Sequence, residues 1–205
     1  MDFSFTEEQL MIQDVARRIA QEKVGPSAEH FDRSGEFPLE NIHLMGENGL
    51  MGIEVPTEYG GAGMDPIAYV LAMVEIAAGD AAHSTIMSVN NSLFCNGILT
   101  HGTEEQKQQY VRAIAEGAEI GAFALTEPAH GSDSIGLESK ATPVEGGYIL
   151  NGAKKWIGNG SMGGITVVWA RSDEDGAVHG FVVPQESEGY TGTTKIGRAS
   201  CRERV

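Results

Sequence analysis

The stretch GAEIGAFALTEPAHGSD, residues 117–133, marks the point where the pattern of this chain changes. Before it, apolar residues recur three and four positions apart, the spacing that favours amphipathic helices. After it, short apolar runs alternate with turns such as Gly146-Gly147, which is typical of strands and hairpins. The sequence therefore predicts an α+β, multidomain chain in which an all-α helical domain, residues 1–117, precedes a small β-barrel domain, residues 118–195.

The helical part carries clear start and stop signals. Thr6-Glu7-Glu8-Gln9 and Thr103-Glu104-Glu105-Gln106 both fit the capping box, in which two side chains bond each other's backbone N–H groups. Asp80 can cap a long apolar helix that runs to about Leu99. Gly25-Pro26 is expected to end the first helix, because proline lacks the N–H that a helix interior needs. In the second part we expect strands at Tyr148–Asn151, Ile165–Ala170 and Val178–Pro184.

Composition excludes several classes of partner and location. The 205 residues include 14 basic and 29 acidic ones, a formal net charge of −15, which argues against nucleic acid and anionic membranes because both bind basic surfaces. No apolar run approaches the roughly 18 residues of a membrane span. The first residues lead directly into a polar helix, so we expect no signal or transit peptide. We therefore expect a bacterial cytoplasmic protein, with a mature mitochondrial-matrix protein as the alternative.

The last ten residues, 196–205, read IGRASCRERV and stand apart from the rest. Their codons can be chosen so that the DNA reads as a common short-read sequencing adapter in frame. We therefore interpret them as an adapter artefact and leave them out of the fold prediction. The alternative is a genuine basic C-terminus. On the first interpretation the natural chain continues beyond Lys195, and Cys95 is the one remaining cysteine.

Several catalytic patterns are absent from the sequence. The six histidines are scattered, and neither H-E-x-x-H nor carboxylates at a metal-binding spacing occur, so we predict no metal site. The sequence also lacks the G-x-S-x-G elbow, the Walker loop and the Rossmann G-x-G-x-x-G pattern. The chemistry must then lie in segments of another kind.

The first candidate segment is FALTEPAHGSD, residues 123–133. We expect a strand to end at Leu125 and the chain to turn through Thr126-Glu127-Pro128. Small and hydroxyl-bearing residues there expose backbone N–H groups and two hydroxyls, which is what a flat polar ring or a pyrophosphate needs. The alternative is an ordinary loop with helix-capping residues.

The second candidate segment is NGAKKWIGNG, residues 151–160. Trp156 offers a flat apolar surface, and Gly158 allows another group to approach the backbone closely. The alternative is a core tryptophan beside a turn.

Together these segments resemble the acyl-CoA dehydrogenase family of flavoproteins. The resemblance covers nearly all of residues 1–195 and includes the opening DFSFTEEQLMI, the loop GLMGIEVPTEYGGAG, the stretch STIMSVNNSLFCNGILTHGTEEQK, and both candidate segments. It implies an N-terminal helical domain, a middle β-barrel domain and a C-terminal four-helix domain. This chain matches the first two, so the resemblance implies a C-terminally truncated fragment.

The resemblance also implies that FAD is the cofactor and assigns residues to it. Phe123 matches a flavin-contacting aromatic residue, and Leu125 and Thr126 match the pair that lines the ring. Ser132 matches the serine beside the FAD pyrophosphate and the CoA substrate. Trp156, Ile157 and Gly158 match the segment that packs against the flavin, although many dehydrogenases have a hydroxyl residue in place of Gly158. That segment is similar to both glutaryl-CoA dehydrogenases and short-chain acyl-CoA oxidases, whereas the N-terminal helices are closer to short-chain dehydrogenases.

The implied reaction is α,β-dehydrogenation of an acyl-CoA thioester to a trans-2-enoyl-CoA. A glutamate removes the α-proton while a hydride leaves the β-carbon, and that base lies in the C-terminal domain of family members, so no catalytic residue is assigned here. Glu127 belongs to the loop and is not given this role. The implied partners are acyl-CoA, an electron-transfer flavoprotein and, for the full-length parent, a homotetramer.

Two alternatives remain open. An acyl-CoA oxidase would pass its electrons to O₂ instead of an electron-transfer flavoprotein. In a different class, the 205-residue chain could be an inactive fragment that at most binds flavin.

Overall fold

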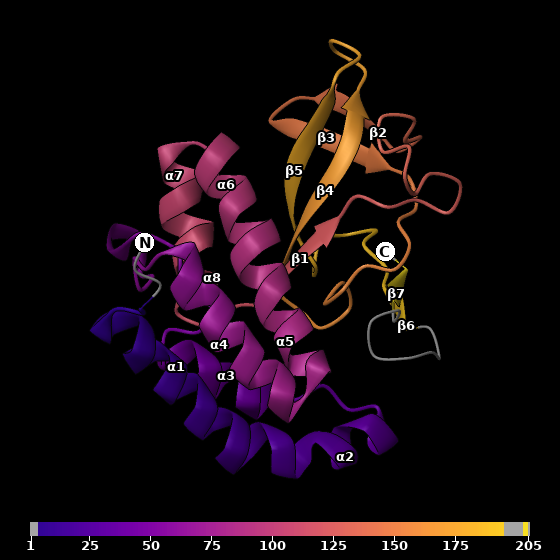
Figure 1. Cartoon of the computed structure of the whole chain (residues 1–205). Coiled ribbons are helices and arrows are strands. Elements are labelled where there is room, and N and C mark those ends of the chain that lie inside the picture. Colours follow the sequence, from indigo (N-terminus) through magenta and orange to yellow (C-terminus); the bar gives the residue numbers. More distant parts are fainter. Residues whose placement is uncertain (1–3, 195–202, 205) are drawn as a thin grey trace. The chain divides into compact units, whose positions relative to one another are not determined.

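A computed structural model describes residues 4–194 and 203–204 of the chain (Figure 1). The contacts divide it into two compact units, Met1–Ile120 and Gly121–Val205. The first is built of helices and the second of strands, so the expected α+β class is confirmed.

Among its described residues, the helical unit contains eight α-helices, three π-helical segments (η1, η3 and η4) and one 3-10 helix (η2). In chain order they are α1 (Glu7–Ile19), η1 (Ala20–Val24), α2 (Gly25–Ser34), α3 (Leu39–Glu47), η2 (Thr57–Tyr59), α4 (Pro66–Gly79), α5 (Ala81–Ser88), η3 (Val89–Cys95), α6 (Asn96–His101), α7 (Glu104–Gln106), η4 (Lys107–Val111) and α8 (Arg112–Ala115). The capping boxes at Thr6 and Thr103 are both formed, and Asp80 caps α5. The helix starts read from the sequence are therefore confirmed.

The expected helix end at Gly25-Pro26 is wrong. The chain stays helical from α1 through η1 into α2, because η1 is a wider π-helical turn in which Gly25 N–H bonds Ala20 O, five residues back. Pro26 then falls at the start of α2, where its missing N–H and its ring are tolerated. A π-helical turn of this kind leaves no simple pattern in the sequence.

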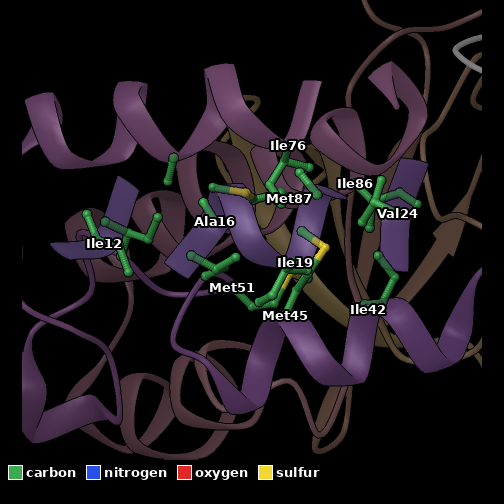
Figure 2. Packing of buried hydrophobic residues seen from close by; sticks show 14 of the residues in the cluster. Ile12, Ala16, Ile19, Val24, Ile42, Met45, Met51, Ile76, Ile86 and Met87 are labelled. Carbon is green, nitrogen blue, oxygen red and sulfur yellow. The ribbon is translucent and has the colours of Figure 1, made fainter. Parts of the chain in front are cut away.

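The core of the helical unit is a cluster of apolar side chains between its helices (Figure 2). Ile12, Ala16 and Ile19 project from α1 at helical spacing, and Ile76 of α4 and Met87 of α5 lie in the same cluster. Burial of such side chains contributes about 1.5–3 kcal/mol each, relative to exposure, which accounts for the stability of this helical layer.

The β-rich unit is built on a five-stranded sheet with a branched pairing. Its strands are β1 (Gly121–Ala124), β2 (Lys140–Val144), β3 (Gly147–Asn151), β4 (Ile165–Ser172) and β5 (Val178–Pro184). The order is β1-β4-β2-β3, and β5 also pairs with β4. The expected β2–β3 hairpin is present, but it turns at Glu145-Gly146, one residue earlier than predicted, because Gly147 already pairs with Val144. Strand β4 pairs in parallel with both β1 and β2. A second, two-stranded pairing joins β6 (Thr193–Thr194) and β7 (Glu203–Arg204).

The pairing of β1 with β4 decides which side chains share a face. Phe123 pairs with Val167, so these two lie on one face, and Ala122 and Ala124 lie on the other. Ile157 packs against the two alanines. One face of β1 thus carries the candidate residue Phe123, and the other packs against the candidate residue Ile157.

Two expectations concern the chain ends and membranes. The predicted adapter segment, residues 196–205, lies outside the described residues except for Glu203–Arg204. Over the described ranges, no helix is both long and apolar enough to cross a membrane.

Candidate functional site

The two candidate segments meet in the β-rich unit. Lys155 N–H donates to Thr126 O at 2.8 Å, which joins the end of β1 to the segment before Trp156. Glu127 N–H donates to His130 O at 3.0 Å and closes the turn that follows. Residues almost thirty positions apart in the sequence are therefore neighbours in space.

A buried carboxylate lies at the centre of this junction. Glu127 Oε1 accepts from Ser139 N–H at 2.9 Å and from Lys154 Nζ at 2.8 Å, and its Oε2 accepts from Glu138 N–H at 2.6 Å. Burial opposes ionisation of this carboxyl, but the Glu138, Lys154 and Ser139 donors outweigh it and lower the pKa of Glu127 to about 2. The group is ionised and fully hydrogen-bonded at neutral pH.

Lys154 is the cation of this pair. Its side chain is 3% exposed and that of Glu127 is 4% exposed, and Lys154 Nζ also donates to Leu125 O at 3.1 Å. Burial lowers the pKa of Lys154, and the Glu127 carboxylate opposes that shift. The pair therefore holds three stretches of backbone together, at residues 125–127, 138–139 and 154–155.

Trp156 has a left-handed backbone conformation and an exposed side chain. Its φ is +62°, a region that a bulky residue rarely adopts, and 54% of its surface is exposed. The ammonium of Lys155 lies 4.3 Å from the centre of its ring, within the range of a cation–π contact. The ring is an exposed flat surface, so the alternative of a core tryptophan is wrong for Trp156.

The other predicted site residues differ in their exposure. Phe123 is half-buried, with its ring 5.7 Å from that of Trp169. Thr126 is also half-buried and Ser132 is exposed, whereas Ile157 is 2% exposed. Leu125 is half-buried and Gly158 is exposed. Ile157 is therefore buried inside the unit, with almost no surface open to a ligand.

Three polar side chains in these segments are available to a ligand. Among the described residues, the hydroxyls of Thr126 and Ser132 and the indole N–H of Trp156 make no hydrogen bond. These donors, together with an exposed aromatic face, fit a flat polar ring and a phosphate group. The described residues contain no group of three histidine, cysteine, aspartate or glutamate side chains that could hold a metal ion.

The sequence analysis missed a buried ion pair and a buried asparagine that hold the site together. It gave no role to Lys154 and treated Glu127 only as part of the loop. It also passed over Asn159, a buried residue with φ +64° whose Nδ2 donates to Gly121 O at 3.0 Å. The available signal was that one candidate segment carries acidic residues and the other carries lysines.

Comparison with known proteins places both units in one family. The family model described as the acyl-CoA dehydrogenase N-terminal domain matches residues 6–118, and that of the acyl-CoA dehydrogenase middle domain matches residues 122–202. A relative from Bacillus subtilis, an acyl-CoA dehydrogenase, is 43% identical over 189 residues, which are 91% of this chain and 50% of the relative.

Solved structures agree with the sequence relatives. A chain from a structure described as the electron transferring flavoprotein of Acidaminococcus fermentans is 37% identical with a TM-score of 0.92, covering 100% of this chain and 56% of that one. A glutaryl-CoA dehydrogenase from Mycobacterium smegmatis in complex with FADH2 is 33% identical with a TM-score of 0.89, covering 98% and 52%. The chain spans about half the length of the relatives it matches. On these matches, the chain belongs to the acyl-CoA dehydrogenase family.

Proposed function

We propose that the β-rich unit binds FAD through the two joined segments, and that the whole protein dehydrogenates an acyl-CoA thioester to a trans-2-enoyl-CoA. The observation that carries the proposal is the junction itself. It brings the Thr126 hydroxyl and the exposed Trp156 ring onto adjoining pieces of backbone, linked at 2.8 Å through Lys155 N–H. The glutaryl-CoA dehydrogenase relative solved with FADH2 supports the choice of cofactor.

Each site residue receives a proposed task. Thr126 donates to the polar edge of the flavin ring, Trp156 covers its face, and Ser132 bonds the pyrophosphate and the CoA. Gly158 contributes its backbone N–H where many relatives have a hydroxyl. Phe123 and Leu125 complete the apolar lining, and Ile157, buried against Ala122 and Ala124, supports it. Bound FAD would supply the acceptor for the substrate hydride.

Glu127 is unsuited to be the catalytic base. A general base needs a pKa near the working pH and a lone pair that faces the substrate. Glu127 has a pKa of about 2, is 4% exposed, and accepts three hydrogen bonds. We therefore propose that proton removal belongs to a glutamate outside this chain, in agreement with the family resemblance.

The remaining assignments of the whole protein are also proposals. They are an acyl-CoA substrate of the short-chain or glutaryl type, an electron-transfer flavoprotein as acceptor, and a homotetramer. The matching chain from the Acidaminococcus fermentans structure favours this acceptor over O₂. We likewise propose domain limits of 1–117 and 118–195 and a cytoplasmic location, with the mitochondrial matrix as the alternative.

The first experiment measures FAD binding by the 205-residue chain. The protein is purified and desalted, its visible spectrum is recorded, and FAD is titrated while the flavin fluorescence is followed. We expect Thr126→Val to weaken binding about tenfold, because a lost hydrogen bond in a dry site is worth about 1–1.5 kcal/mol. The matched control is Thr142→Val, which removes a β2 hydroxyl that donates to Asp173 Oδ2 at 2.6 Å. Equal affinities of these two variants, or a wild-type chain that never binds FAD, would refute the proposed site.

Turnover separates the three candidate functions. A longer protein that contains this sequence and the proposed base is mixed with butyryl-CoA or glutaryl-CoA and an artificial electron acceptor without oxygen, and peroxide is measured separately in air. The 205-residue chain is assayed in parallel. Dye reduction without peroxide indicates a dehydrogenase, and peroxide formation indicates an oxidase. FAD binding without either signal places this chain in the class of inactive, flavin-binding fragments.

A further inference from the structure

The Glu127–Lys154 pair lies behind the proposed FAD site rather than in it. The side chains are 4% and 3% exposed, and the polar atoms of both are occupied by protein partners. A ligand cannot reach either charge without opening this part of the unit. Any influence of the pair on a ligand must therefore act through the backbone that it holds.

That backbone carries the residues proposed to touch the flavin. Lys154 Nζ donates to Leu125 O at 3.1 Å, and the next residue along each segment makes the Lys155 N–H to Thr126 O bond at 2.8 Å. The pair and this bond form two consecutive links between the same two segments. Thr126 and Trp156 each lie within one position of a link.

The strain at Trp156 needs such a support. A bulky residue at φ +62° costs about 1–3 kcal/mol and persists only where its surroundings fix it. The links at Lys154 and Lys155 fix the chain before Trp156. After it, Ile157 is buried against Ala122 and Ala124. Loss of the preceding links would let the backbone at 156 relax and the ring move.

We propose that the buried Glu127–Lys154 ion pair is a positioning element, which presets Thr126 and Trp156 for the flavin without touching it. The inference rests on the proposed FAD site. On this inference the pair fixes the position of the flavin-contacting residues in addition to stabilising the fold. Two properties must therefore change together when the pair is broken. They are the FAD affinity of the folded protein and the local order of the linked backbone.

The test compares Lys154→Met, the double variant Glu127→Gln/Lys154→Met, and wild type, each as the whole 205-residue chain. The matched control is Phe181→Ala, which weakens the same sheet at β5, where Phe181 meets the Tyr148 ring, and leaves the linked segments intact. FAD affinity is measured by fluorescence titration and corrected for the folded fraction, and the visible circular dichroism of bound FAD is recorded. We expect at least tenfold weaker binding and an altered flavin spectrum in both pair variants, and neither change in Phe181→Ala. The double variant leaves no buried charge, so it serves if Lys154→Met does not fold.

A second readout does not depend on FAD. Hydrogen exchange is followed at the amides of Lys155, Glu138 and Ser139, with the amide of Ser172, which donates to Ala177 O at 2.8 Å, as internal control. We expect at least tenfold faster exchange at the first three amides and no change at Ser172 in the pair variants. Unchanged exchange, or wild-type FAD affinity with an unchanged flavin spectrum, overturns the inference. If wild type does not bind FAD, the proposed function fails, and hydrogen exchange alone decides whether the pair positions this backbone.

Discussion

Both units use a buried polar side chain to hold distant stretches of backbone together, but the two side chains differ in charge. In the helical unit, Asn91 accepts from Ile53 N–H at 2.7 Å and donates to Leu50 O at 2.9 Å and Met87 O at 3.0 Å. In the β-rich unit, Glu127 gathers two consecutive backbone N–H groups and Lys154. Each buried side chain ties distant pieces of backbone together, but one is neutral and the other is charged.

This difference follows from which backbone donors and acceptors need a hydrogen-bond partner in each unit. The loop at residues 50–53 offers one acceptor and one donor, which an amide matches because it has both functions. The segment before β2, residues 138–139, offers two donors, which a carboxylate matches with two acceptor oxygens. A buried carboxylate then requires a cation, and Lys154 uses a further proton on Leu125 O. We call the backbone contacts of Asn91 the neutral tie, and the Glu127–Lys154 pair with its backbone contacts the charged tie. The stability contributed by the neutral tie should be independent of pH, whereas that contributed by the charged tie should depend on pH.

The largest expected effect follows from removing one charge. Lys154→Met leaves the Glu127 carboxylate buried without its cation, which typically costs about 3–5 kcal/mol of unfolding free energy. Urea unfolding followed by tryptophan fluorescence measures it, because both tryptophans, Trp156 and Trp169, lie in the β-rich unit.

The double variant Glu127→Gln/Lys154→Met is the control for that prediction, because it leaves no buried charge. It should recover part of the loss. A cost below about 1 kcal/mol for Lys154→Met would contradict the distinction between a charged and a neutral tie.

Lowering the pH should reduce the stability contributed by the charged tie and leave that contributed by the neutral tie unchanged. The pKa of Glu127 is lowered from 4.5 to about 2 by folding, so the carboxylate contributes stability that is present above pH 4.5 and lost as the pH falls toward 2. The loss amounts to about 3 kcal/mol. Urea unfolding between pH 6 and 2.5, by tryptophan fluorescence, gives its slope. Glu127→Gln should flatten this slope, and an equally steep slope in that variant would exclude Glu127 as its source.

Removing the neutral tie should cost less. Asn91→Ala leaves Ile53 N–H and Leu50 O buried without this partner, at a cost of about 2 kcal/mol. Far-ultraviolet circular dichroism during urea unfolding reports on the helical unit. The cost should stay constant between pH 5 and 8, and a strong pH dependence would mean that a charged group shares this tie.

Relief of strain should raise stability slightly. Trp156→Gly removes a side chain from a φ of +62°, where glycine is unstrained, and its exposed ring contributes little packing. We expect a gain of about 0.5–1 kcal/mol, read from the fluorescence of Trp169. FAD affinity should fall at the same time. A loss of stability would show that the ring packs more than it strains.

Local patterns predicted much of the fold, and long-range contacts could not be predicted. The Thr6 and Thr103 capping boxes and the β2–β3 hairpin depend on residues within four positions, so local patterns identified them, the hairpin turn to within one residue. The parallel pairing of β1 with β4 and the Glu127–Lys154 pair join residues 27 or more positions apart. No period in the sequence encodes such contacts. The candidate segments themselves were found through residue chemistry and the family resemblance, and the assigned FAD contacts stay predictions.

The smallest expected effect comes from an exposed ion pair, which separates the contribution of burial from that of charge. Arg33 and Glu29 on α2 form an ion pair of the same type as Lys154 and Glu127, but their side chains are 79% and 74% exposed. Water solvates both partners when the pair is broken, so Arg33→Ala should change the unfolding free energy by less than the error of a urea titration. Circular dichroism at low and high salt provides the measurement. A clear, salt-sensitive loss would mean that attraction between opposite charges is itself strongly stabilising in this protein. The large effect expected at Lys154 would then no longer require an unsolvated carboxylate as its cause.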